Sequence, residues 1–337
     1  MHGSPLSPNP AVTRVGLFAM MLVMDAVTAL APVFFALAVG YAAGRFRIID
    51  NIHVDGLNTL VMKIALPLLL FTILAGARRA DVVEHGALAA VALLVMGVTY
   101  LAVVVLQRTA NRRDTAVAAV QALTVAFPNT GALALPIAES VLGPTGELAV
   151  AVSLAVGALT LSPLTITLLE LRNAGAGPTG KRAVRAFGKA LITPVVVAPA
   201  IGLAWSLAGI PLPPLVSTTL NEIGGLTAGL ALFVTGLVLS SQSLKITGEV
   251  AWGVLVADIA RPLLAIGVVA AVGMTGIVAA EVVLLMAVPS GFFGVLMALS
   301  HRVPSGAAGP TLFYSTLLSG ATLPIVILLL PVLYPGS

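Results

Sequence analysis

The 337-residue sequence contains no cysteine and few charged or aromatic residues. The lack of cysteine excludes disulfide bonds, thiolate metal ligands and cysteine nucleophiles. Charged residues make up 9% of the chain, against about 25% in a soluble domain. Apolar residues make up 59%, and the mean hydropathy is +1.09. This composition is typical of a polytopic membrane protein, so the net charge of +4 does not indicate a nucleic-acid partner.

Groups that would support chemistry inside a membrane are also missing. The four histidines (His2, His53, His85 and His301) form no metal-ligand pair at helical spacing. No apolar stretch contains an aspartate pair, a histidine base beside a serine, or a metal motif. We therefore expect neither an enzyme nor a cofactor, and a membrane-embedded receptor or enzyme is a remote alternative.

Ten apolar stretches have the length of about 20 residues that a membrane-spanning helix needs. They cover residues 26–44, 57–76, 86–106, 115–142, 147–170, 190–208, 215–240, 249–272, 277–300 and 309–333. The sequence thus predicts an all-α membrane protein with ten transmembrane helices.

The longest polar interruption, residues 172–189, divides the ten spans into two halves of five. We predict a tail or extension over residues 1–24, a first five-helix repeat over residues 25–171, a basic cytoplasmic linker over residues 172–189, and a second five-helix repeat over residues 190–337. Because five is odd, the second repeat is inserted upside down relative to the first.

Basic residues gather in the loops that follow odd-numbered spans. They are Arg45, Arg47, Arg108, Arg112, Arg113, Arg172, Lys181, Arg182, Arg185, Lys189, Lys245 and Arg302. Since basic loops stay in the cytoplasm, both termini are predicted on the outer side of the cell (plasma or inner) membrane.

Prolines inside the spans support the duplication. Pro128 and Pro289 are 161 residues apart, Pro163 and Pro324 are 161 apart, and Pro32 and Pro194 are 162 apart. All three pairs are collinear, and they match span 1 with 6, span 4 with 9 and span 5 with 10. An internal repeat is the interpretation that this order favours.

Spans 4 and 9 are predicted to be broken at their prolines. Proline removes a backbone donor, and glycine close behind it loosens the next turn. Two interrupted spans at matching positions indicate a substrate site near the midplane, where half-helix amino ends at about Gly131 and Gly291 offer free amides to an anion such as a carboxylate. The predicted substrate-binding residues are Pro128, Asn129, Thr130, Gly131, Pro289, Ser290, Gly291 and Phe292. The alternative is that each proline merely kinks a continuous helix.

Five polar residues within the spans are candidates for coupling or for lining a cavity. Asp258 and Arg261 are three residues apart on one helix face, either as a structural ion pair or as a coupling element. Lys63 either snorkels to the interface or faces the cavity. Gln121 and Ser162 either line the cavity or hydrogen-bond within the helices.

Four segments resemble the auxin efflux carrier family, including its bacterial members. They are Ile64–Pro67, Pro128–Pro136, Pro289–Gly294 and Leu317–Pro324. The resemblance covers nearly the whole chain from about Met24. It departs after the second proline, where Ser290 and Gly291 replace the asparagine of plant carriers, and the long cytoplasmic loop of those carriers is missing.

The resemblance implies a fold and a mechanism. The fold, related to that of bile-acid symporters and sodium/proton antiporters, has ten spans in which spans 4 and 9 cross. Spans 1, 2, 6 and 7 form a scaffold, spans 3–5 and 8–10 form a mobile transport domain, and the carrier is often a homodimer. The implied function is elevator-type, alternating-access transport of small organic anions such as auxin, malonate or malate. The alternative is a proton- or sodium-coupled symporter or antiporter of another small solute on the same fold.

Overall fold

The structure is a computed structural model that describes residues 31–49, 54–142, 144–173, 179–241 and 244–335. Over these ranges the regular secondary structure is helical, apart from one isolated antiparallel bridge between Pro128 and Ser290. The predicted all-α class is confirmed. The predicted tail, residues 1–24, lies outside the described residues.

Six helical stretches of the described chain are long and apolar enough to cross a membrane. They are Val54–Gly76 (α2, η2 and α3), Gly86–Thr109 (α5), Leu148–Arg172 (within α8, η4 and α9), Pro214–Ser240 (α12 and α13), Gly248–Ala271 (α14, η5 and α15) and Ala308–Leu333 (α18). A seventh crossing results if Gly180–Leu191 and Pro194–Leu207 (α10 and α11) count as one bent span.

Three shorter apolar helices lie in the other predicted stretches: Ala31–Arg45, α6 (Thr115–Ala126) and α16 (Gly276–Ala287). Beyond α6 the chain continues as η3 (Thr130–Ala134) and α7 (Leu135–Leu142), and beyond α16 it continues as α17 (Phe293–Ser300). Length and composition therefore support six or seven spans, and the ten-span topology stays a prediction.

The second part of the predicted linker is helical. Helix α10 (Thr179–Leu191) is amphipathic and rich in basic residues. It meets α11 (Pro194–Leu207) at an angle of 60°. The bend lies at Thr193, whose backbone is extended, because the residue before a proline disfavours helical geometry.

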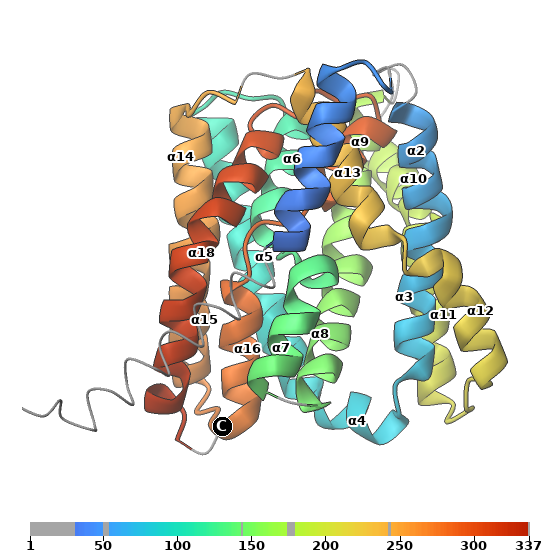
Figure 1. Cartoon of the computed structure of the whole chain (residues 1–337), viewed down its shortest axis with the longest axis vertical. Coiled ribbons are helices and arrows are strands. Elements are labelled where there is room, and N and C mark those ends of the chain that lie inside the picture. Colours follow the sequence, from blue (N-terminus) through green and yellow to red (C-terminus); the bar gives the residue numbers. More distant parts are fainter. Residues whose placement is uncertain (1–30, 50–53, 143, 174–178, 242–243, 336–337) are drawn as a thin grey trace, which may run out of the picture.

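The helices form two groups in Figure 1. On one side α3 (Leu66–Gly76) packs against α11 and α12 (Pro214–Gly224). On the other side α5 contacts α6, α8 (Pro144–Val156), α15 (Arg261–Ala271) and α16. The short helix α4 (Arg79–Glu84) connects α3 to α5 at the lower end of Figure 1, where α18 also ends. The basic loops before α6 and α14 lie at the opposite end.

Four π-helical segments each end two residues before a proline. They are η2 (Val61–Ala65) before Pro67, η3 before Pro136, η4 (Gly157–Leu161) before Pro163 and η5 (Val256–Ala260) before Pro262. A proline ring clashes with the carbonyl four residues earlier, and a wider turn relieves that clash without ending the helix. A π-helical turn therefore allows each of these four apolar helices to continue through its proline.

Candidate functional site

The helices α6 and α16 both stop at the predicted proline breaks. Helix α6 begins at the Asp114 cap, whose side chain accepts from the Val117 amide, and it ends at Ala126, two residues before Pro128. Helix α16 ends at Ala287, two residues before Pro289. Because proline supplies no amide and restricts the residue before it, each helix ends where the sequence predicts.

The two breaks pair with each other in the protein interior. The amide of Asn129 donates to the carbonyl oxygen of Pro289 at 2.9 Å, and Pro128 bridges Ser290 in antiparallel fashion. The Gly291 amide donates to the Thr124 carbonyl at 3.0 Å. Backbone groups that no longer have helical partners are thereby satisfied without water.

These bonds correct one expectation. The Gly291 amide was expected to be free for an anion, but it is bonded to Thr124. The Ser290 amide is also engaged, since it donates to the Ser315 hydroxyl at 2.8 Å. The Ser290 and Gly291 amides of the second break are therefore occupied by α18 and by α6, and side chains remain to meet a ligand.

Side chains at the junction are buried without partners. Asn129 is 1% exposed, and neither its amide nitrogen nor its carbonyl oxygen has a hydrogen-bond partner. The Ser290 hydroxyl, on the facing strand of the bridge, is likewise buried and unpaired. An unpaired buried polar group costs about 1–3 kcal/mol, so these side chains are free to pair with water or with a bound molecule.

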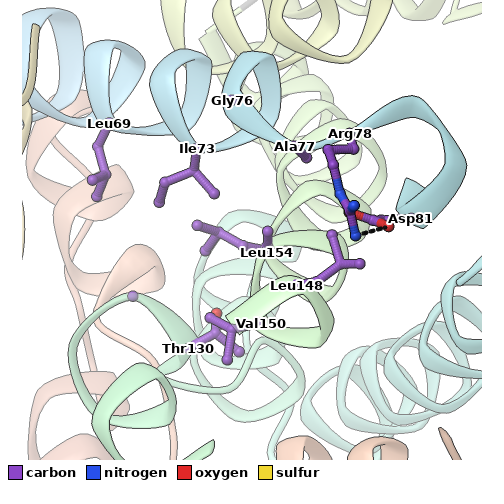
Figure 2. A pocket seen from close by; sticks show the side chains of 12 residues that line it. Leu69, Ile73, Gly76, Ala77, Arg78, Asp81, Thr130, Leu148, Val150 and Leu154 are labelled. Carbon is purple, nitrogen blue, oxygen red and sulfur yellow. Dashed lines mark hydrogen bonds and ion pairs between the residues drawn. The ribbon is translucent and has the colours of Figure 1, made fainter. Parts of the chain in front are cut away.

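A cavity of about 490 Å³ reaches the first break from the side of α3 (Figure 2). Its wall is mostly apolar, with Leu69 and Ile73 of α3 on one side and Thr130 and Gly131 of η3 on the other. Arg78 and Asp81 also line it and form a two-pronged ion pair with N–O distances of 2.6 and 2.8 Å. Of the predicted substrate-binding residues, Thr130 and Gly131 therefore line this cavity.

Aromatic rings pack against one another at the paired breaks. The ring of Phe292 stacks on Phe293 at 5.3 Å between centroids, and Phe293 meets Phe127 at 4.5 Å. Phe292 is 1% exposed. The predicted site residue Phe292 is therefore buried against Phe293, which also contacts Phe127 of the first break.

The pair predicted from the spacing of Asp258 and Arg261 does not form. In the described part of the chain these two side chains make no ion pair within 4.0 Å. Asp258 accepts from the Ser315 hydroxyl at 2.7 Å, and its second oxygen is buried and unpaired. The Arg261 guanidinium donates instead to the carbonyls of Val125, Met286 and Val288. The three-residue spacing is right for a pair, but longer-range partners prevail.

The other candidates are dispersed. Lys63 is exposed on η2 and does not line the cavity beside Thr130. Gln121 donates to the Thr311 hydroxyl at 2.9 Å, so it joins α6 to α18. Ser162 is fully buried at the start of α9 (Ser162–Asn173), and its hydroxyl has no partner.

A buried pair that was not predicted from the sequence lies between α16 and the start of α5 (Gly86–Thr109). Glu281 of α16 is fully buried, and its carboxylate lies 3.5 Å from Nε2 of His85, the residue before α5. The other ring nitrogen of His85 lies 2.8 Å from the Asp81 carbonyl. A lone carboxylate in an apolar stretch is costly, and that signal alone would have selected Glu281.

Comparison with known proteins identifies the family of this chain. The sequence model of the family described as membrane transport protein matches residues 25–327. The chain belongs to this family, that of the auxin efflux carriers. It is 28% identical to the "Uncharacterized transporter YfdV" of Escherichia coli (strain K12) over 301 residues, which cover 88% of this chain and 95% of that relative. It is 25% identical to an "Uncharacterized transporter" of Methanothermobacter thermautotrophicus over 311 residues, or 90% of this chain and 98% of that relative. The resemblance seen in the sequence is confirmed, and the chain is a multi-pass membrane transporter.

Proposed function

We propose that this transporter carries small organic anions, carboxylates such as malonate, malate or auxin-like acids, and binds them where the two breaks pair. The observation that carries the proposal is the Asn129 carboxamide at the paired breaks, which is buried without a hydrogen-bond partner in the protein. An amide nitrogen and a hydroxyl donate to a carboxylate, and donors in a dry site are worth more than in water. The half-helix that begins at Thr130 adds the positive end of its dipole.

Ten spans, as two inverted five-helix repeats, are the proposed topology. Its support is the placement of the breaks, since two helices from opposite halves of the chain stop at Pro128 and Pro289 and pair there. The end of the molecule opposite α4 carries basic loops, so under the positive-inside rule it is proposed to face the cytoplasm, with both termini outside.

An elevator movement is the proposed mechanism. The scaffold would be the helix Ala31–Arg45 with α2 (Val54–Leu60), α3 and α11–α13, and the other spans would move past it. The cavity between α3 and η3 supports this division, because it separates the paired breaks from the proposed scaffold. We also propose that two copies associate through the scaffold as a homodimer. Its support is the exposed apolar surface of α12, on which Leu215 is 80% exposed.

The energy source is proposed to be the membrane potential acting on the charge of the substrate, about 2.3 kcal/mol per charge per 100 mV. The runner-up is a proton- or sodium-coupled carrier of another small solute. Two buried carboxylates, Asp258 and Glu281, favour that reading, because intramembrane carboxylates mark proton and ion relays. Uptake into proteoliposomes under separately imposed voltage, pH and sodium gradients distinguishes the two. A response to sodium alone would exclude the proposed energy source.

The site is tested by thermal shift of the purified protein against small mono- and dicarboxylates. A binding acid raises the melting temperature of the wild type, and Asn129→Ala abolishes that rise. The matched control is Asn221→Ala on α12, where the side chain is exposed and far from the breaks in sequence. If Asn129→Ala and Asn221→Ala respond to the acid like the wild type, the acid binds elsewhere and the proposed site is wrong.

A further inference from the structure

Arg261 is a fully buried arginine in the middle of a membrane protein. It is 0% exposed, and its guanidinium donates to the backbone carbonyls of Met286 (2.9 Å), Val125 and Val288. A buried charge at this depth is costly and survives where something compensates it. Here the compensation comes from backbone oxygens and not from a carboxylate within ion-pair distance.

The three carbonyls share one property: they lie at the carboxyl ends of the two broken helices. Val125 is in the last turn of α6, Met286 is in the last turn of α16, and Val288 follows α16 directly. Carbonyls in the last turn have lost their helical donors, and each helix end carries about half a negative elementary charge. The carboxyl ends of α6 and α16 both lie against the Arg261 guanidinium. Their combined partial charge is about one negative elementary charge, which one positive charge would balance.

In many transporters a bound cation balances the negative partial charge of such helix ends. Unwound carbonyls and the carboxyl ends of half-helices are the groups that coordinate sodium in carriers with broken helices. Asp258, three residues before Arg261, has one buried, unpaired oxygen, and the Ser315 hydroxyl that donates to its other oxygen accepts from the Ser290 amide. Carbonyl, hydroxyl and carboxylate oxygens are the types of ligand that a monovalent cation takes in such carriers.

We propose that Arg261 is a tethered cation that fills a monovalent-cation site at the crossing, so that this carrier holds its broken helices together without a bound sodium ion. Arginine suits the role because its charge is permanent and its planar fork reaches several acceptors at once. The proposal concerns how the crossing is held, and it stands whichever solute is carried.

Chemical rescue tests the proposal. Wild type, Arg261→Ala and the surface control Arg185→Ala, an exposed position on α10, are purified and melted in equal concentrations of sodium, guanidinium or choline chloride. We expect wild type and Arg185→Ala to melt at the same temperature in all three salts. We expect Arg261→Ala to melt ~5–10 °C lower in choline, and guanidinium or sodium to restore most of that loss by entering the vacated site.

A second variant separates charge from packing. Arg261→Lys keeps the charge and should melt at one temperature in all three salts, whereas the neutral Arg261→Gln should need the added cation. If Arg261→Ala is equally unstable in every salt, or is recovered unfolded in every salt, the site does not accept a free cation and the proposal is wrong. It is equally wrong if Arg261→Gln in choline melts like the wild type, because the charge is then dispensable.

Transport gives an independent readout. Wild-type uptake should be unchanged when choline replaces sodium, and uptake by Arg261→Ala should require sodium or guanidinium. If wild type takes up no carboxylate at all, the proposed function fails while the melting data still decide the role of Arg261. If wild-type uptake stops without sodium, the tethered cation does not replace a bound one and the proposal fails.

Discussion

Gly294 lies against Thr124 so closely that no side chain fits between α17 and α6. A β-carbon at Gly294 would overlap the Thr124 hydroxyl and the Val120 carbonyl, and it would lie 2.9 Å from the Thr124 amide nitrogen. Since two of these three groups are backbone, they cannot rotate away. Gly294→Ala should therefore destabilise the protein by ~1–3 kcal/mol, seen as a lower melting temperature in detergent.

The matched control is Gly97→Ala in the middle of α5, where an added β-carbon meets no atom within 4 Å. Alanine favours a helix over glycine by roughly 0.5–1 kcal/mol, so this variant should be neutral or slightly more stable. Equal melting temperatures for Gly294→Ala and Gly97→Ala would contradict the close approach of α17 to α6.

Tyr100 and Thr165 form a buried hydroxyl pair between α5 and α9, with 2.9 Å between their oxygens. Thr165→Val keeps the shape but leaves the phenol unpaired, which should cost ~1–3 kcal/mol. The double variant Tyr100→Phe with Thr165→Val removes both polar groups and should recover most of the loss. Melting temperatures of the two single variants and the double variant measure this coupling, and purely additive effects would refute the bond.

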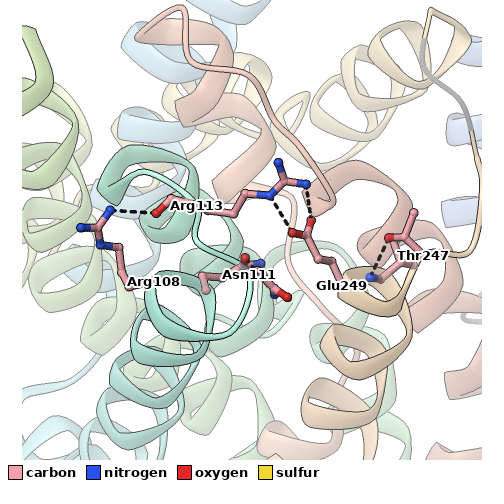
Figure 3. Close-up of polar contacts among 7 residues, drawn as sticks. Arg108, Asn111, Arg113, Thr247 and Glu249 are labelled. Atoms are coloured by element: carbon pink, nitrogen blue, oxygen red, sulfur yellow. Dashed lines mark hydrogen bonds and ion pairs between the residues drawn. The ribbon is translucent and has the colours of Figure 1, made fainter.

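An ion pair joins the α5–α6 loop to α14 (Gly248–Leu255) at the basic end of the molecule (Figure 3). Arg113 reaches both oxygens of Glu249, with N–O distances of 2.6 and 3.0 Å. Because the Arg113 side chain is 51% exposed, water and salt screen the pair. Glu249→Gln should cost at most ~1 kcal/mol, less at high salt, whereas Glu222→Gln on α12 should cost nothing. A large, salt-independent loss in the melting temperature of Glu249→Gln would contradict this estimate.

Asn129→Asp tests the sign of the charge on the solute. The new carboxylate has nearly the shape of the amide but repels an anion at close range, which costs several kcal/mol. Affinity for a carboxylate, measured by titration calorimetry, should fall by more than ~100-fold. Asn221→Asp adds the same charge on exposed α12 and should leave the affinity unchanged. Tighter binding of a cationic solute by Asn129→Asp would favour the alternative class of transporter.

The sequence was sufficient to locate the breaks. Pro128 and Pro289 act on their own helices, so the ends of α6 and α16 follow from local chemistry. The family also follows from these segments, and it is confirmed. The helical half of the linker was not predicted, because the apolar positions of α10 are too few to resemble a span.

The partners of the buried polar side chains could not be predicted from the sequence, because these side chains reach residues far away along the chain. Arg261 and Asp258 have the right spacing for a local pair, yet Arg261 reaches carbonyls 25, 27 and 136 residues away. Their positions depend on how three helices pack. The same holds for Ser315, which joins the Ser290 amide to Asp258, because a hydroxyl in an apolar helix usually bonds to its own backbone.

The backbone bond from Asn129 to Pro289 restricts how access to the site can alternate. A gate that opened by parting the two helix tips would strip main-chain groups of their partners in a medium without water. In the proposed elevator movement the two helix ends would therefore travel together, with a bound solute enclosed between them. Access from one compartment or the other would then depend on the position of the paired breaks relative to α3, which lines the cavity beside Thr130 and Gly131.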